Sequence, residues 1–180
     1  IHSIPGENCS SIIENGEIKV SATMRETSLF GHALELKRII RSEIGSGKLV
    51  IEDELTNLTP EDEEYMIIYH MNFGYPFLSP DLKMTLPPDT LTTPRTKYAE
   101  KFIGRETEFT MPIDGEEETV FFNTDATPDA DSMATVTLEN PILGIGAHLR
   151  YSMDTLPIMA HWRCMKSGDY VLGIEPTNSY

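Results

Sequence analysis

The strand pattern of this chain is clearest in residues 133–175, which read MATVTLENPILGIGAHLRYSMDTLPIMAHWRCMKSGDYVLGIE. Short apolar runs alternate in this stretch with polar loops such as MKSGD, a pattern typical of consecutive antiparallel strands. We therefore predict four strands, at 133–139, 145–152, 157–164 and 169–175.

The same pattern continues toward the N-terminus. Residues 17–25, EIKVSATMR, place an apolar residue at every second position, which is the period of a half-buried strand. Residues 32–44 also begin with this alternation. A stripe through Leu36, Ile39 and Ile40 fits a helix as well, but we favour a strand because the neighbouring segments are strands. Further strands are predicted at 48–56, 65–72, 107–112 and 118–123.

About ten short strands without a convincing helix indicate an all-β fold, either an antiparallel sandwich or a barrel. Residues 76–94 hold five of the 12 prolines and predict a long irregular connection. A chain of 180 residues suits one domain. We therefore predict a single antiparallel β domain over residues 1–180, with the choice between a sandwich and a barrel left open by the strand pattern.

The net negative charge of the chain disfavours some classes of binding partner. The chain has 14 Lys and Arg against 29 Asp and Glu, for a formal net charge of −15. Clustered cations are needed to bind phosphates, so this composition argues against nucleic acid and against an anionic membrane surface. A neutral or cationic ligand remains compatible, and the main effect of the charge is solubility.

Cysteine and histidine usage gives no metal or disulfide pattern. The two cysteines, Cys9 and Cys164, cannot build a disulfide framework or a CxxC zinc site, and free thiols suit a reducing cytoplasm. Five histidines are spread along the chain without an HxH or HExxH pair. His161 and Cys164 are three residues apart, which places them on opposite faces of a strand. We predict no metal and no cofactor.

The segment 69–76, YHMNFGYP, is the first candidate for a functional site. On a strand, His70 and Asn72 point the same way and form a polar spot in an apolar wall. Sugar pockets combine rings for the C–H faces with a few polar groups for the hydroxyls. The alternative is a core histidine whose hydrogen bonds are satisfied.

The second candidate segment is 161–176, HWRCMKSGDYVLGIEP. Glu175 ends an apolar strand, where a carboxylate is destabilised by desolvation unless it has a partner or a function. Trp162 is the only tryptophan and is suited to stack on a sugar ring. The alternatives are a solvent-exposed rim glutamate and a core tryptophan.

A histidine and a glutamate that face one pocket form an acid–base pair. Such a pair suits ring opening of a sugar hemiacetal without a cofactor. Glu175 as base would take the proton of the anomeric hydroxyl, and His70 as acid would protonate the ring oxygen as the C1–O5 bond breaks. Reclosure on the other face gives the other anomer.

These two segments carry a family resemblance. YHMNFGYP followed by LPIMAHWRCMKSGDYVLGIEPTN resembles the aldose 1-epimerase (galactose mutarotase-like) superfamily, and most closely its DUF4432 branch. DELTN and TPRTKYAEKF are similar to that branch as well. The resemblance implies a large antiparallel β-sandwich of the supersandwich type and an isomerase whose general acid is His70 and whose general base is Glu175. The implied partner is a monosaccharide or a sugar derivative.

The resemblance also points to further candidate site residues and leaves two alternative functions open. Arg95 and Arg163 are candidates to donate hydrogen bonds to sugar hydroxyls, and Asp125 is a candidate for the acidic loop residue of the family. Asn72 and Trp162, from the two segments above, complete the candidate substrate-binding set. An HG-containing segment usually precedes a stretch like IHSIPGE in this branch, so we expect the N-terminal part of the sandwich to lie outside this chain and to associate with it. The alternatives to an epimerase are a catalytically silent sugar-binding or sugar-sensing protein and an enzyme for a different sugar isomerisation.

Overall fold

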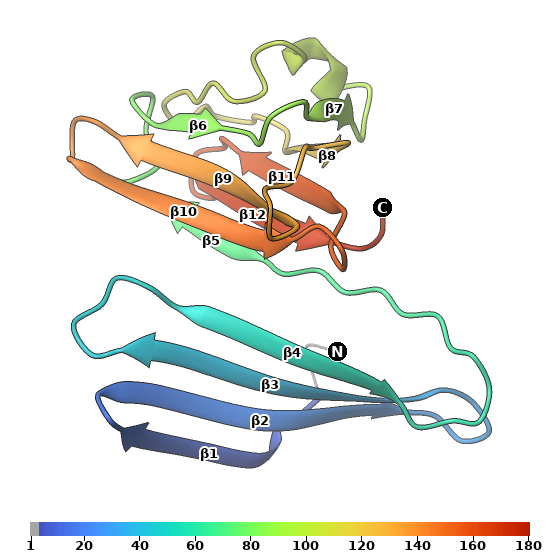
Figure 1. Ribbon diagram of the computed structural model, residues 1–180. Helices are drawn as coiled ribbons and strands as arrows, with labels where there is room; N and C mark the ends of the chain where they lie inside the picture. Colours follow the sequence, from blue (N-terminus) through green and yellow to red (C-terminus); the bar gives the residue numbers. More distant parts are fainter. Residues whose placement is uncertain (1–3) are drawn as a thin grey trace. The chain divides into compact units, whose positions relative to one another are not determined.

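The computed structural model describes residues 4–180. In this part of the chain the one helical element is η1 (Ala99–Phe102), a short 3-10 turn, and the other regular elements are β-strands (Figure 1). Neighbouring strands in every sheet pair antiparallel. The predicted all-β antiparallel fold is confirmed.

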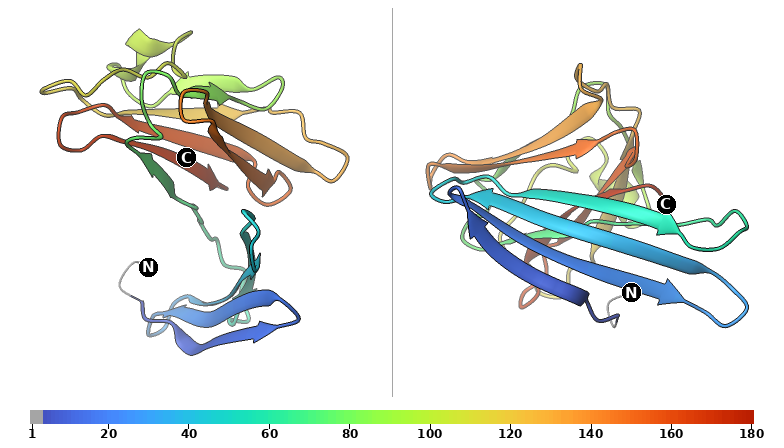
Figure 2. Two further views of the ribbon diagram at one scale, coloured as in Figure 1. Left: turned by 90° about the vertical axis from the view of Figure 1, so that its left-hand side faces the viewer. Right: turned by 60° about the horizontal axis from the view of Figure 1, so that its bottom comes forward.

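The chain divides into two compact units, one up to Tyr65 and one from Met66 to Tyr180. The first is a four-stranded sheet in chain order, with strands β1 (Glu7–Glu14), β2 (Glu17–Thr27), β3 (Ala33–Glu43) and β4 (Val50–Asn57). Figure 2 shows these strands side by side, joined by short hairpin turns. The single-domain expectation for residues 1–180 stays a prediction.

One face of the sheet of the first unit is mainly apolar, and it also carries the ion pair of Arg38 with Asp53. The register of β2 with β3 places Val20 opposite Ile40 and Met24 opposite Leu36, so apolar side chains gather on one face. Residues 33–43 form a strand and not a helix, as favoured from the sequence. Strand β1 was not predicted, because all eight of its residues are exposed and burial therefore imposes no alternation on them.

The second unit is built from two sheets that share one core. The three-stranded sheet has the order β10 (Ile145–Ser152), β9 (Met133–Asn140) and β6 (Lys83–Thr85). The five-stranded sheet has the order β5 (Met71–Gly74), β12 (Val171–Thr177), β11 (Ile158–Cys164), β8 (Thr119–Thr124) and β7 (Leu91–Pro94). In Figure 1 the β9–β10 hairpin belongs to a different layer from β11 and β12. Val136 and Leu138 of the small sheet join Met159, Leu172 and Ile174 of the large one in a buried cluster. The second unit is therefore a β-sandwich.

Two predicted strands are wrong in whole or in part. Residues 107–112 form no strand. Side chains from other segments bind the backbone carbonyls of these residues in place of a partner strand: Arg163 donates to the carbonyl of Glu108 at 2.6 Å, and Tyr170 donates to the carbonyl of Thr110 at 2.5 Å. The predicted strand at 65–72 begins only at Met71. Ahead of it, Ile68 makes an isolated bridge to Thr177. The connection 76–94, expected to be irregular, contains the short strands β6 and β7.

Residues 4–180 contain no helix that is both long enough and apolar enough to cross a membrane.

Candidate functional site

One face of the five-stranded sheet carries a cavity of about 620 Å³, within the range of small-molecule sites. Side chains alternate along a strand, so each central strand contributes to both the core and the cavity. On β12, Leu172 and Ile174 enter the core while Glu175 and Thr177 line the cavity. The full lining comprises Met66, Ile67, Ile68, His70, Arg95, Glu118, Val120, Phe122, Ala160, Trp162, Glu175, Thr177, Ser179 and Tyr180.

His70 and Glu175 meet in this cavity. The Nε2 atom of His70 lies 2.9 Å from Oε1 of Glu175. Backbone contacts bring them together: Ile68 bridges to Thr177, and the Tyr69 amide donates to the Pro176 carbonyl at 2.9 Å. The chain ahead of β5 therefore runs along the end of β12. The side chain of Glu175 is 8% exposed and that of His70 44%, so the carboxylate lies deeper in the cavity than the imidazole.

Glu175 has the environment of a general base. Burial raises the pKa of its carboxyl above the usual value, and the positive charges of His70 and Arg95 offset part of this shift. Although His70 is close, buried Oε1 accepts no hydrogen bond of regular geometry from the described residues. A carboxylate with a raised pKa and a free lone pair is a stronger proton acceptor than an ordinary glutamate.

Trp162 forms a wall of the cavity next to His70. Its ring meets the imidazole edge to face, with 5.7 Å between centroids and 71° between planes. The indole Nε1 donates a hydrogen bond to Oε2 of Glu118 at 2.9 Å. Glu118 thus fixes the ring orientation and adds a second carboxylate to the site.

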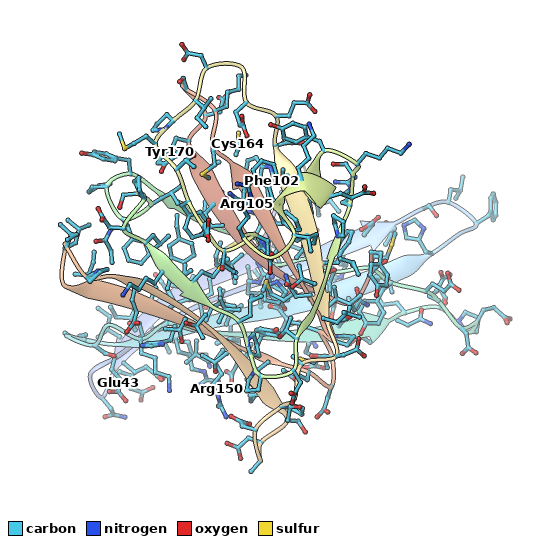
Figure 3. All side chains as sticks on the ribbon, turned by 90° about the horizontal axis from the view of Figure 1, so that it is seen from above. Glu43, Phe102, Arg105, Arg150, Cys164 and Tyr170 are labelled. Carbon is cyan, nitrogen blue, oxygen red and sulfur yellow. The ribbon has the colours of Figure 1, made fainter. Side chains whose placement is uncertain are left out.

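Arg95 and Glu118 reach the cavity from the two ends of one connection. Residues 95–118 join β7 to β8, and both terminal residues of this connection line the cavity. Its middle part packs on the other face of the sheet, where the guanidinium of Arg163 lies 5.1 Å from the centre of the Phe102 ring. Figure 3 shows Phe102 next to Arg105 in this part, and the guanidinium of Arg105 lies 5.3 Å from the centre of the Phe102 ring.

The structure brings four of the seven predicted site residues together, namely His70, Glu175, Trp162 and Arg95. The other three lie elsewhere. Asn72 lies in β5 opposite Gly173 and therefore faces the same side of the sheet as His70, but it does not line the cavity. Arg163 is buried on the core face of β11, and Asp125 follows β8 and accepts a hydrogen bond from its neighbour Thr124.

Glu118 is the charged residue of the cavity lining that was not predicted from the sequence. It lies in the acidic run Glu116–Glu118, which resembles a solvated loop. A local signal was present, because Glu118, directly ahead of β8, alternates with Val120 and Phe122 in that strand, and all three line the cavity. Among the described residues, no three His, Cys, Asp or Glu side chains are placed to hold a metal ion.

The raised pKa of Glu175 predicts that Glu175→Gln stabilises the fold at neutral pH. In the folded protein the carboxyl holds its proton more tightly than in the unfolded chain, where the pKa is near 4.3. Stability is therefore lost as the pH rises through the window between these two pKa values. Thermal melts from pH 4 to pH 8 should show a higher Tm for the variant at pH 8 and a difference that closes toward pH 4. A variant that is less stable than the parent at pH 8 would contradict this account.

The comparisons with known proteins give the family and a structure of similar fold. The model of the family described as "Domain of unknown function (DUF4432)" matches residues 1–180. A crystal structure described as that of a "putative aldose 1-epimerase" from Klebsiella pneumoniae subsp. pneumoniae MGH 78578 is similar, with a TM-score of 0.86 and 26% sequence identity. The match covers 96% of this chain and 45% of that one, so this chain spans less than half the length of its structural relative. No curated protein matched. The chain belongs to the DUF4432 family.

Proposed function

We propose that this protein is an aldose 1-epimerase-like enzyme that interconverts the anomers of a sugar by general acid–base catalysis. The observation that carries the proposal is the contact of His70 with Glu175 in a cavity of about 620 Å³. In a sugar hemiacetal the anomeric hydroxyl oxygen and the ring oxygen are bonded to the same carbon. An acid and a base that serve these two oxygens must therefore lie close to each other.

The reaction needs one base and one acid. Glu175 removes the proton of the anomeric hydroxyl while the bond from C1 to the ring oxygen breaks. The imidazolium of His70 gives its proton to that ring oxygen, which leaves an open-chain aldehyde. After rotation about the C1–C2 bond, the hydroxyl formed from the ring oxygen attacks the other face of the aldehyde. This hydroxyl gives its proton back to His70, and Glu175 gives its proton to the former carbonyl oxygen, which becomes the new anomeric hydroxyl.

The remaining walls of the cavity suit a sugar ring. Trp162 offers an aromatic face, and Phe122 and Tyr180 form a second aromatic pair, with ring centroids 5.1 Å apart. Arg95 and Glu118 supply a donor and an acceptor for hydroxyl groups. An aromatic surface with a few convergent polar groups is typical of sites for neutral polar ligands.

The comparison supports the substrate class. The Klebsiella protein is described as a "putative aldose 1-epimerase", and 26% of aligned residues are identical. We extend the substrate class, a sugar, from that protein to this one as part of the proposal. The free thiols Cys9 and Cys164 are compatible with a cytoplasmic location.

The test is anomer exchange by saturation-transfer NMR over a panel of hexoses and pentoses. We expect exchange above the buffer rate for at least one sugar. The methyl glycoside of that sugar should bind without exchange, because it has no anomeric hydroxyl proton for Glu175 to remove. Binding of several sugars without exchange of any would reject the enzyme and leave a sugar-binding protein.

A further inference from the structure

One position beside the acid–base pair has no side chain. Gly173 lies in β12, two residues before Glu175, and therefore on the same face of the sheet. Its register partners are Trp162 on β11 and Asn72 on β5. The backbone at Gly173 is thus flanked by paired strands on both sides.

The backbone conformation does not require glycine at this position. Gly173 is not among the glycines with positive φ, which in the described chain are Gly16, Gly45, Gly104, Gly115, Gly144 and Gly168. A glycine in a strand interior is destabilising relative to alanine. The reason for glycine at 173 must therefore lie in the space above the sheet.

That space is taken by the groups of the site. A Cβ atom on residue 173 would collide with Oε1 of Glu175, and it would lie 3.1 Å from Cε1 of His70 and 3.3 Å from Cε3 of Trp162. The atom that collides is the far end of a flexible side chain. The fold can therefore accept a Cβ if the carboxylate of Glu175 turns away from His70.

We propose that Gly173 is a positioning residue, whose missing side chain lets the carboxylate of Glu175 lie against His70 and face the cavity. The inference rests on the proposed function for its consequence in catalysis, but the placement of the carboxylate can be measured without any activity.

Gly173→Ala tests the inference, with Gly74→Ala as its matched control. Gly74 is also a strand glycine without positive φ, and the nearest atom to its Cβ would be 3.8 Å away, an ordinary contact. We expect Gly173→Ala to lower kcat by roughly 10–10²-fold with a smaller change in KM, because a displacement of about 1 Å is enough for such a loss. Gly74→Ala should leave both values unchanged.

The readout independent of activity is the titration of the Glu175 carboxyl by carbon-detected NMR. In the parent protein burial holds the pKa of Glu175 above its usual value. In Gly173→Ala the displaced carboxylate should titrate closer to an ordinary glutamate. An unchanged titration would overturn the inference. A changed titration in a protein without epimerase activity would support the positioning role and reject only the proposed function.

The double variant Gly173→Ala/Glu175→Ala covers the case in which Gly173→Ala fails to fold. Removal of the carboxylate removes the atom that the new Cβ would strike, so the double variant should melt at the same temperature as Glu175→Ala alone. A double variant that is much less stable than Glu175→Ala would show that His70 or Trp162 is the obstacle, and it would contradict the inference.

Discussion

Replacement of Glu175 by glutamine is expected to lower kcat for anomer interconversion by roughly 10²–10⁴-fold, the range that general acid–base catalysis contributes. The amide has nearly the same shape as the carboxylate but cannot take the proton of the anomeric hydroxyl. KM should change little, because the walls of the cavity remain. Polarimetry of a freshly dissolved pure anomer measures the rate directly.

The control for this loss is a glutamate outside the cavity. Glu139 is exposed on β9 of the three-stranded sheet, and Glu139→Gln removes the same charge from the chain. This control should turn over at the parental rate. Parental turnover in Glu175→Gln would remove Glu175 as the base.

The second large effect concerns the stability of the fold in acid. His161 is fully buried, stacks on Phe121 with ring centroids 4.8 Å apart, and accepts a hydrogen bond from the Asn123 amide through Nδ1 at 2.9 Å. Burial, helped by the positive charge of Arg163, lowers its pKa from 6.5 to about 3. The folded protein therefore holds this ring neutral at pH values where the unfolded chain protonates it.

This shift sets the direction of the pH dependence. The stability linked to His161 is complete above about pH 6.5 and is lost as the pH falls toward 3, with a loss of roughly 5 kcal/mol over the whole window. Urea unfolding of the parent and of His161→Gln between pH 7 and pH 4 should show a steep loss for the parent and a shallower one for the variant. His148→Gln, an exposed position on β10, is the control. Equal slopes for the parent and His161→Gln would contradict this account.

The sequence was informative about the fold wherever one face of a strand is buried and the other is not. Residues 17–25 and 133–139 alternate for this reason, and both lie in strands of the structure. Strand β1 is exposed throughout and gives no such signal. For residues 107–112 the sequence predicted a strand that does not exist. Phe109 is buried there, but the segment is held by side-chain hydrogen bonds and not by strand pairing.

The candidate site could be predicted only where single residues are chemically conspicuous. A carboxylate at the end of an apolar strand and a histidine among aromatic residues pointed to Glu175 and His70. Whether Glu118 and Gly173 belong to the site depends on which strands are neighbours and on the register in which they pair. Strand β11 pairs with β12, which follows it in the chain, and with β8, which lies about 40 residues before it. The local alternation shows that Glu118 shares a face with Val120 and Phe122, but local sequence does not show which strands lie beside that face.

Anomer exchange in the parent protein and in His70→Asn/Glu175→Gln tests most directly whether these two residues are the acid and the base. Both are measured by saturation transfer on the same sugar at equal protein concentration. We expect exchange above the buffer rate in the parent and none above it in the double variant. Since the aromatic walls of the cavity are retained, the sugar should still bind to the variant. Exchange at the parental rate in the double variant would show that His70 and Glu175 are not the acid and the base.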